Sequence, residues 1–126
     1  MLRARQNAMP LSWSGSESMV EHMGIMNDTK WEEIRLAMYG LGELIPKWRT
    51  RDRETGFESP WDGEWFYHFR SGGYATIEWL EIEVSYDAQR TLVLEALHAI
   101  QVPGEDMGHV LRIYGYVPSG TEVEYL

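Results

Sequence analysis

The chain has 126 residues, a formal net charge of −9 and no cysteine. The length fits one domain with its own hydrophobic core. Without cysteine, disulfides and thiolate metal sites are excluded, and a reducing, cytoplasmic location is expected. No apolar run reaches the roughly 20 residues that span a bilayer. The acidic charge disfavours nucleic acid and anionic membranes and favours a basic partner, although solubility alone also explains it.

Residues 1–25 differ from the rest of the chain. They are rich in serine, and Arg3 and Arg5 are not followed by the apolar run of a secretion signal. We expect a disordered lead or an over-extended start. The arginines and glutamates of this stretch cancel, so the charge of −9 belongs to residues 26–126, which we expect to form a single domain.

A helix is predicted to begin at residues 27–29. Thr29 followed by Glu32 fits a capping box. Apolar residues then recur at helical spacing, which indicates one buried stripe made of Trp31, Ile34, Ala37, Met38 and Leu41. Gly40, Gly42 and Pro46 mark the end of the helix.

Residues 47–53 alternate and predict a short strand. Arg49, Arg51 and Arg53 share one side of this strand. They indicate either a solvated edge strand protected by charge or a clamp for an anion. Residues 54–60 contain Gly, Ser and Pro and are predicted to be a loop.

A central hairpin is predicted over residues 64–84. Strand 64–70 places Trp65, Tyr67 and Phe69 on one face and Phe66, His68 and Arg70 on the other. Residues 71–73 (Ser-Gly-Gly) supply the turn, and strand 74–84 follows. In the second strand one row is apolar and the other becomes acidic. This alternation is typical of a sheet with one face on helices and the other in water.

A second helix is predicted over residues 87–100, capped by Ser85 or Asp87. Its expected buried stripe is Leu92, Val93, Ala96, Leu97 and Ile100. An acidic loop, a strand over 109–117 and a short strand at 122–126 complete the chain. The order of elements predicts an α+β fold, a mostly antiparallel sheet of four to five strands with two helices packed on one face.

The sheet face opposite the helices is the predicted binding site. Aromatic residues set among charges are typical of protein interfaces. The predicted partner-binding residues are Trp79, Glu81, Glu83, Arg112, Tyr114 and Tyr116. Alternatively, this aromatic cluster only stabilises the sheet, or the C-terminal tail covers it.

Catalytic motifs are absent from the sequence. It has no G-x-S-x-G elbow, no phosphate-binding loop and no metal spacing among its histidines. We therefore expect no cofactor, no metal and no enzyme activity. The alternative is a small enzyme or ligand-binding domain in which Asp62, Glu64 and His68 perform acid–base chemistry. The simpler interpretation of these acids is a solvated strand end.

Spaced tryptophan motifs give one resemblance. They are Met26–Trp31 (MNDTKW), Arg49-Thr50, Trp61–Trp65 (WDGEW) and Ile77–Glu81 (IEWLE). With these motifs, residues 26–126 resemble a family of small bacterial proteins of unknown function, which implies that residues 1–25 lie outside the family. Small, acidic, cysteine-free α+β proteins are similar in character to immunity proteins. By this analogy we expect a cytoplasmic protein that neutralises a cognate toxin, with a basic toxin domain as its partner.

Overall fold

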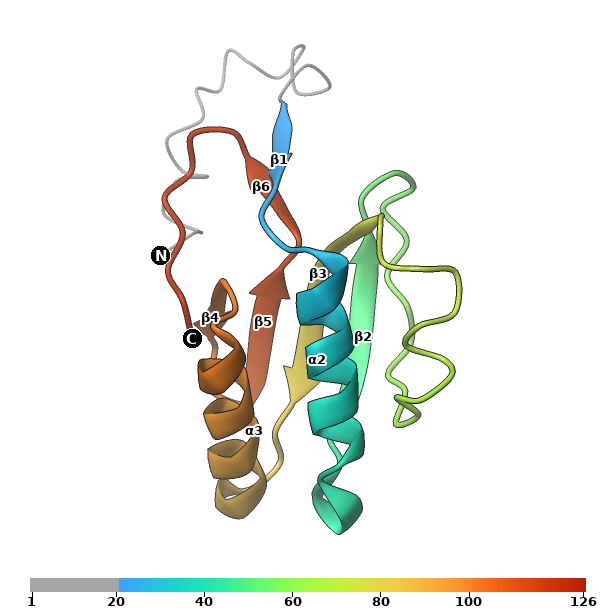
Figure 1. Ribbon diagram of the computed structural model, residues 1–126, viewed down its shortest axis with the longest axis vertical. Helices are drawn as coiled ribbons and strands as arrows, with labels where there is room; N and C mark the ends of the chain where they lie inside the picture. Colours follow the sequence, from blue (N-terminus) through green and yellow to red (C-terminus); the bar gives the residue numbers. More distant parts are fainter. Residues whose placement is uncertain (1–20) are drawn as a thin grey trace.

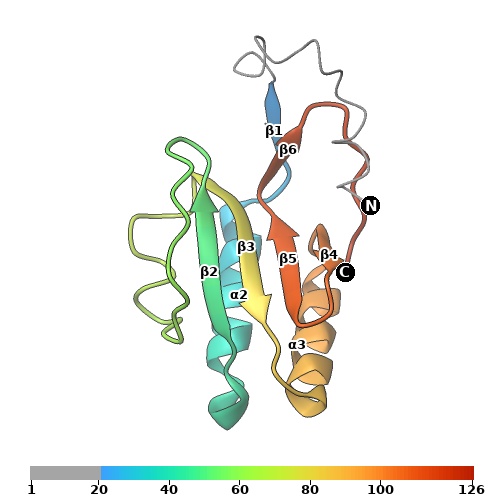
Figure 2. The ribbon, with the colours of Figure 1, turned by 180° about the vertical axis from the view of Figure 1, so that it is seen from behind.

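A computed structural model describes residues 21–126 as two layers (Figures 1 and 2). A four-stranded antiparallel sheet has the order β2-β3-β5-β4, and both α-helices cover one of its faces. A separate two-stranded sheet joins β1 and β6. The elements are β1 (His22–Gly24), α2 (Asp28–Tyr39), the 3₁₀ helix η2 (Gly42–Leu44), β2 (Lys47–Asp52), β3 (Ile77–Glu83), α3 (Asp87–Ile100), β4 (Gly104–Asp106), β5 (Val110–Tyr114) and β6 (Tyr116–Pro118). The predicted α+β class is confirmed.

The main core lies between the helices and the sheet. The buried side chains that form it include Ile34, Met38, Leu80, Ile82, Val93, Leu97, Leu111 and Ile113. The predicted helices are present, but their caps differ. Asn27, not Thr29, caps α2, since its side chain accepts the backbone N–H of Lys30 at 2.8 Å. Tyr86 precedes α3 in place of Ser85 or Asp87.

The predicted hairpin is wrong in its first half. Residues 64–76 form turns, and β3 pairs with β2 and β5 instead. The carboxylate of Glu64 accepts the backbone N–H groups of residues 66, 67 and 68 at 2.7–3.0 Å, which winds the chain into a turn. Trp65 and Phe69, four residues apart, are both buried with ring centroids 4.8 Å apart. These contacts outweigh the alternating pattern.

The expected domain start at residue 26 is also wrong within the described residues. Residues 22–24 form β1, which pairs antiparallel with residues 116–118 of β6. Ile25 donates its N–H to the carbonyl of Gly115 at 2.9 Å. Residues 21–25 are thus part of the fold. Residues 1–20 of the predicted lead lie outside the described residues.

The C-terminal part is divided differently from the prediction. The expected acidic loop forms β4, and the expected strand 109–117 splits at Gly115 into β5 and β6. The expected strand at 122–126 is reduced to one bridge between Pro103 and Tyr125. Leu92, predicted to be buried, is exposed on α3. None of the helices in residues 21–126 is long and apolar enough to cross a bilayer.

Gly115 is required by a close approach of two backbone segments. A Cβ at this position would lie 2.1 Å from the carbonyl oxygen of Ile77 and 3.1 Å from the indole of Trp31. Backbone atoms cannot move aside as a flexible side chain can, so strands β5 and β6 would have to separate from β3. Gly115 therefore fixes where the main sheet ends and the smaller sheet begins.

We predict that Gly115→Ala lowers the free energy of unfolding by about 2–3 kcal/mol, because the added methyl group overpacks this contact. Urea denaturation measures the change. Gly63→Ala is the matched control, since a Cβ there meets no atom within 4 Å. Equal stabilities of the two variants would contradict the role given to Gly115.

Candidate functional site

A row of alternating charges crosses the sheet face that looks away from the helices. In the strand register, Arg49 of β2 lies opposite Glu81 of β3, Glu81 opposite Arg112 of β5, and Arg112 opposite Glu105 of β4. Arg49 Nε donates to Glu81 Oε1 at 2.7 Å, and Arg112 Nε donates to Oε2 at 2.8 Å. We call these residues the charge row. It neutralises itself across all four strands.

Aromatic rings stack against the guanidinium groups of the charge row. Arg49 lies 4.7 Å from the ring of Trp61 and 5.9 Å from that of Trp79, and Arg112 lies 4.6 Å from Trp79 on the other side. Cation–π contacts of this kind hold planar groups in layers. The stack covers Glu81, whose side chain is only 2% exposed.

The prediction of an open aromatic sheet face is therefore wrong for three of its members. Trp79, Glu81 and Tyr114 are buried. Trp79 and Tyr114 form a second apolar cluster with Val117, packed by Met23, Ile25 and Val123. Segments from both ends of the described chain thus cover this face, in agreement with the alternative that the tail covers it.

The other three predicted residues are partly exposed. Glu83, Arg112 and Tyr116 are half-buried, and Tyr116 donates its hydroxyl to the carbonyl of Ala75 at 2.7 Å. Arg53 lies 4.2 Å from the Tyr116 ring. The six residues therefore do not form one continuous exposed surface. Partner binding by the whole set stays a prediction.

The three arginines in and directly after β2 are engaged with separate partners. Arg49 belongs to the charge row, Arg51 pairs with Glu58 at 2.9 Å and Glu78 at 3.3 Å, and Arg53 lies over Tyr116. Residues 57–62 hydrogen-bond along the outer edge of β2. The geometry favours a covered edge strand over the anion clamp.

The three residues of the alternative acid–base site do lie together. His68 Nδ1 lies 2.8 Å from Asp62 Oδ2 and 3.9 Å from Glu64 Oε1. The His68 side chain is 62% exposed. The three backbone N–H groups held by Glu64, that of His68 first, lower the pKa of this carboxyl. Glu64 is a turn-capping residue, and Asp62 Oδ1 likewise accepts the backbone N–H of Glu64 at 2.8 Å while its Oδ2 faces His68.

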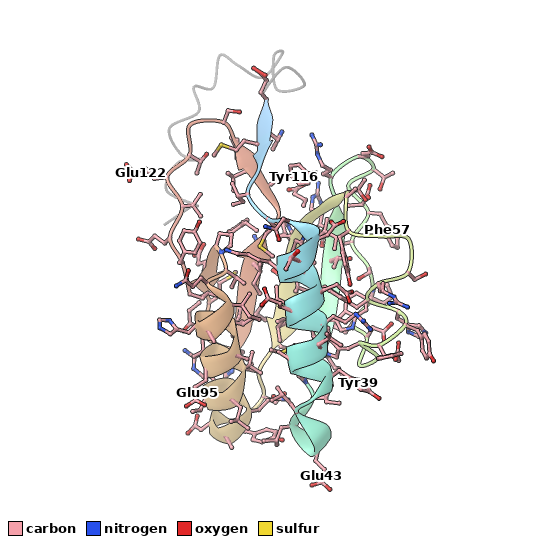
Figure 3. All side chains as sticks on the ribbon, viewed as in Figure 1. Tyr39, Glu43, Phe57, Glu95, Tyr116 and Glu122 are labelled. Atoms are coloured by element: carbon pink, nitrogen blue, oxygen red, sulfur yellow. The ribbon has the colours of Figure 1, made fainter. Side chains whose placement is uncertain are left out.

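An exposed apolar surface lies beside these residues, and the sequence reading missed it. We call it the aromatic patch: Leu36 and Tyr39 on α2 with Phe66 and Tyr67. The Tyr39 and Phe66 centroids are 5.1 Å apart and those of Phe66 and Tyr67 4.8 Å. Tyr39 is 50% exposed and Tyr67 is 67% exposed. Tyr39 and Glu43 lie at one end of the molecule, away from Tyr116 (Figure 3).

A buried arginine supports the aromatic patch from below. Arg35, on α2, donates to both carboxylate oxygens of Glu32 at 2.9 Å and to the carbonyl of Phe66 at 2.7 Å. Its guanidinium lies 4.9 Å from the Phe66 ring. The hydroxyl of Tyr74 donates to the same Glu32 carboxylate. These bonds fasten segment 64–76 to α2, so the two halves of the patch are held together.

Hydrogen bonds from Arg35 and then from Tyr74 lower the pKa of Glu32 from 4.5 to about 2. Burial and the bond to Glu32 raise the pKa of Tyr74. Within residues 21–126, no group of three or more His, Asp or Glu side chains is arranged to hold a metal ion. The exposed aromatic patch and its neighbouring carboxylates form the surface that we take as the candidate functional site.

We predict that Glu81→Leu lowers the free energy of unfolding by about 3 kcal/mol, because Arg49 and Arg112 lose the buried carboxylate that both of them bind. The quadruple variant Arg49→Leu, Glu81→Leu, Glu105→Leu, Arg112→Leu loses less, since it removes every charge of the row and leaves none unpaired. Chemical denaturation compares the two. A quadruple variant that is the less stable one would contradict this account of the charge row.

A second prediction concerns acid stability. Because the folded-state pKa of Glu32 is below its unfolded value, its contribution is complete above about pH 4.5 and is lost as the pH falls toward about 2. We expect Glu32→Gln to be less stable than the parent at pH 7 and to lose less stability between pH 5 and pH 2. Thermal unfolding across this range measures it. Parallel pH profiles would refute the coupling.

Comparison with known proteins gives one match. The model of the family described as "Family of unknown function (DUF6678)" matches residues 16–120, most of the chain. Neither the curated proteins nor the solved structures contain a match. The matched range begins before residue 26, so the implied exclusion of residues 1–25 is corrected for residues 16–25. The chain belongs to the Family of unknown function (DUF6678).

Proposed function

We propose that this protein binds a basic protein partner through the aromatic patch. In its most concrete form, the proposal makes it a cytoplasmic immunity protein that neutralises a cognate toxin domain. One observation carries it: exposed aromatic side chains sit on a firmly held, acidic part of the fold. A toxin is proposed as the partner by analogy, because immunity proteins are similarly small, acidic, cysteine-free α+β proteins.

The composition of the aromatic patch supports binding. Tyrosine and phenylalanine are enriched where proteins meet, because they bury a large area and have few rotatable bonds. Phe66 already contacts both Tyr39 and Tyr67, and Arg35 binds the backbone of the segment that carries Phe66. Little conformational freedom is then lost on association, which favours affinity.

Charge supports the choice of a basic partner. Glu33 and Glu43 are exposed on α2 and directly after it, and Asp62 and Glu64 lie beside the other half of the patch. Arg70 is an exposed, positively charged residue on the same segment. With a net charge of −9, the protein attracts cationic surfaces over a distance and speeds the encounter, an effect that salt weakens.

The product of the gene next to this one is the partner to test. We expect the two proteins, co-expressed, to form a complex by size-exclusion chromatography, and this protein to protect cells in which its neighbour is toxic. The variant Tyr39→Ala, Tyr67→Ala should weaken the complex by at least 30-fold, because it removes the exposed rings. Association should slow as salt rises.

Tyr86→Ala is the matched control. Tyr86 is as exposed as Tyr39, at 50%, but it lies at the start of α3. Its replacement should leave the complex unchanged. Equal losses in the control and in the double variant, or full binding by the double variant, would reject the aromatic patch as the docking surface.

A second candidate follows from the proximity of Asp62 and His68. A carboxylate 2.8 Å from an imidazole nitrogen orients the ring and supports proton abstraction by its other nitrogen. This candidate predicts a turnover that His68→Ala abolishes and Glu64→Gln retains. If His68→Ala protects cells from the toxin as well as the parent does, the site has no part in neutralisation.

A further inference from the structure

A cavity opens at the other end of α2. Its volume is about 500 Å³, and it lies between the first turn of α2, the end of α3 and the last residues of the chain. The lining residues are Lys30, His98, Gln101, Tyr125 and Leu126. Small-molecule sites commonly measure about 300–1,000 Å³. Lys30 is about 14 Å along the helix from Tyr39, so the cavity is separate from the aromatic patch.

Lys30 is held at the wall of the cavity. Its Nζ donates to the carbonyl of Gln101 at 2.6 Å and lies 5.7 Å from the ring centroid of Tyr125. An ammonium group has three N–H donors, so this single bond leaves others for a ligand. Lys30 and Lys47 are the lysines of the sequence, and Lys47 is exposed on β2. A fixed ammonium in an acidic protein favours an anionic ligand.

The backbone conformation of Gln101 indicates that its side chain has a role at the cavity. It ends α3 with φ 65°, and it is the one non-glycine residue at positive φ in residues 21–126. Glycine is preferred in this left-handed position, because a Cβ crowds the backbone. The carbonyl that accepts Lys30 would be present in glycine too. Gln101 is one of the residues that line the cavity, and its side chain is the group that glycine would lack.

The remaining walls define the ligand. His98 Nδ1 lies 3.4 Å from a main-chain carboxylate oxygen of Leu126, the last residue of the printed sequence, so Nε2 is the other ring nitrogen available to a ligand. The ring of Tyr125 and the side chain of Leu126 supply apolar surface. We propose that this cavity binds a small aromatic anion, with its carboxylate or phosphate at Lys30 and Gln101 and its ring against Tyr125. This site is independent of the function proposed above.

Benzoate, phenyl phosphate and neutral benzamide are the probes, titrated into the full chain and followed by NMR. We expect saturable shifts at Lys30 and Tyr125 with a dissociation constant of about 1 mM for at least one anion, as suits fragments of this size. Which anion binds more tightly identifies the head group. Benzamide should bind at least tenfold more weakly. Lys30→Ala should bind the anion at least tenfold more weakly than the parent, and Lys47→Ala should bind it like the parent.

Gln101→Gly separates a ligand-binding role from a structural one. We expect its melting temperature to rise by about 3–5 °C, because glycine suits the left-handed backbone, while its affinity for the anion falls at least threefold. Should Lys30→Ala fail to fold, Lys30→Met keeps the aliphatic stem. The proposal is overturned if neither anion gives saturable shifts, if benzamide binds equally well, or if Gln101→Gly retains full affinity.

Discussion

The buried guanidinium of Arg35 is the interaction on which this surface depends. It joins Glu32 on its own helix to the backbone of Phe66, and Tyr74 completes the connection through the same carboxylate. A buried arginine without these partners would be strongly unfavourable, so the bonds fix the position of segment 64–76 against α2. Exposed rings far apart in sequence become neighbours on a fixed base as a result.

The two faces of the sheet differ in the residues that they bury. One is covered by helices and carries the main apolar core. The other buries Glu81, and only the paired arginines make that burial tolerable. Segments from both ends of the described chain then close over Trp79 and Tyr114. This charged face therefore stabilises the four strands and fixes their register. The exposed surface proposed for binding lies on the helical side of the sheet.

The parts of the fold that depend on short-range pattern could be predicted. Helical spacing located α2 and α3 to within a few residues, and alternation located β2 and the apolar row of β3. The hairpin could not be predicted, because residues 64–70 alternate like a strand although Glu64 binds their backbone N–H groups in a turn. A side-chain acceptor of this kind gives no periodic signal.

The site was the least predictable part, because it depends on contacts between distant residues. The burial of Trp79 and Tyr114 follows from packing by Met23 and Val123, which no local pattern reveals. Leu36 and Tyr39 stood outside the predicted stripe of α2, which was the one sequence signal for an exposed surface. The contact of Tyr39 with Phe66 is supported by the bond from Arg35 to the Phe66 carbonyl, which joins residues 31 positions apart.

Hydrogen–deuterium exchange of the protein with and without its partner is the most direct test of the proposed docking surface. The account predicts slower exchange confined to the C-terminal half of α2 and residues 64–70, with β2, β3 and β5 unchanged. Protection of the strands around Arg112 and Glu83, with α2 unaffected, would contradict it and return the binding site to the sheet.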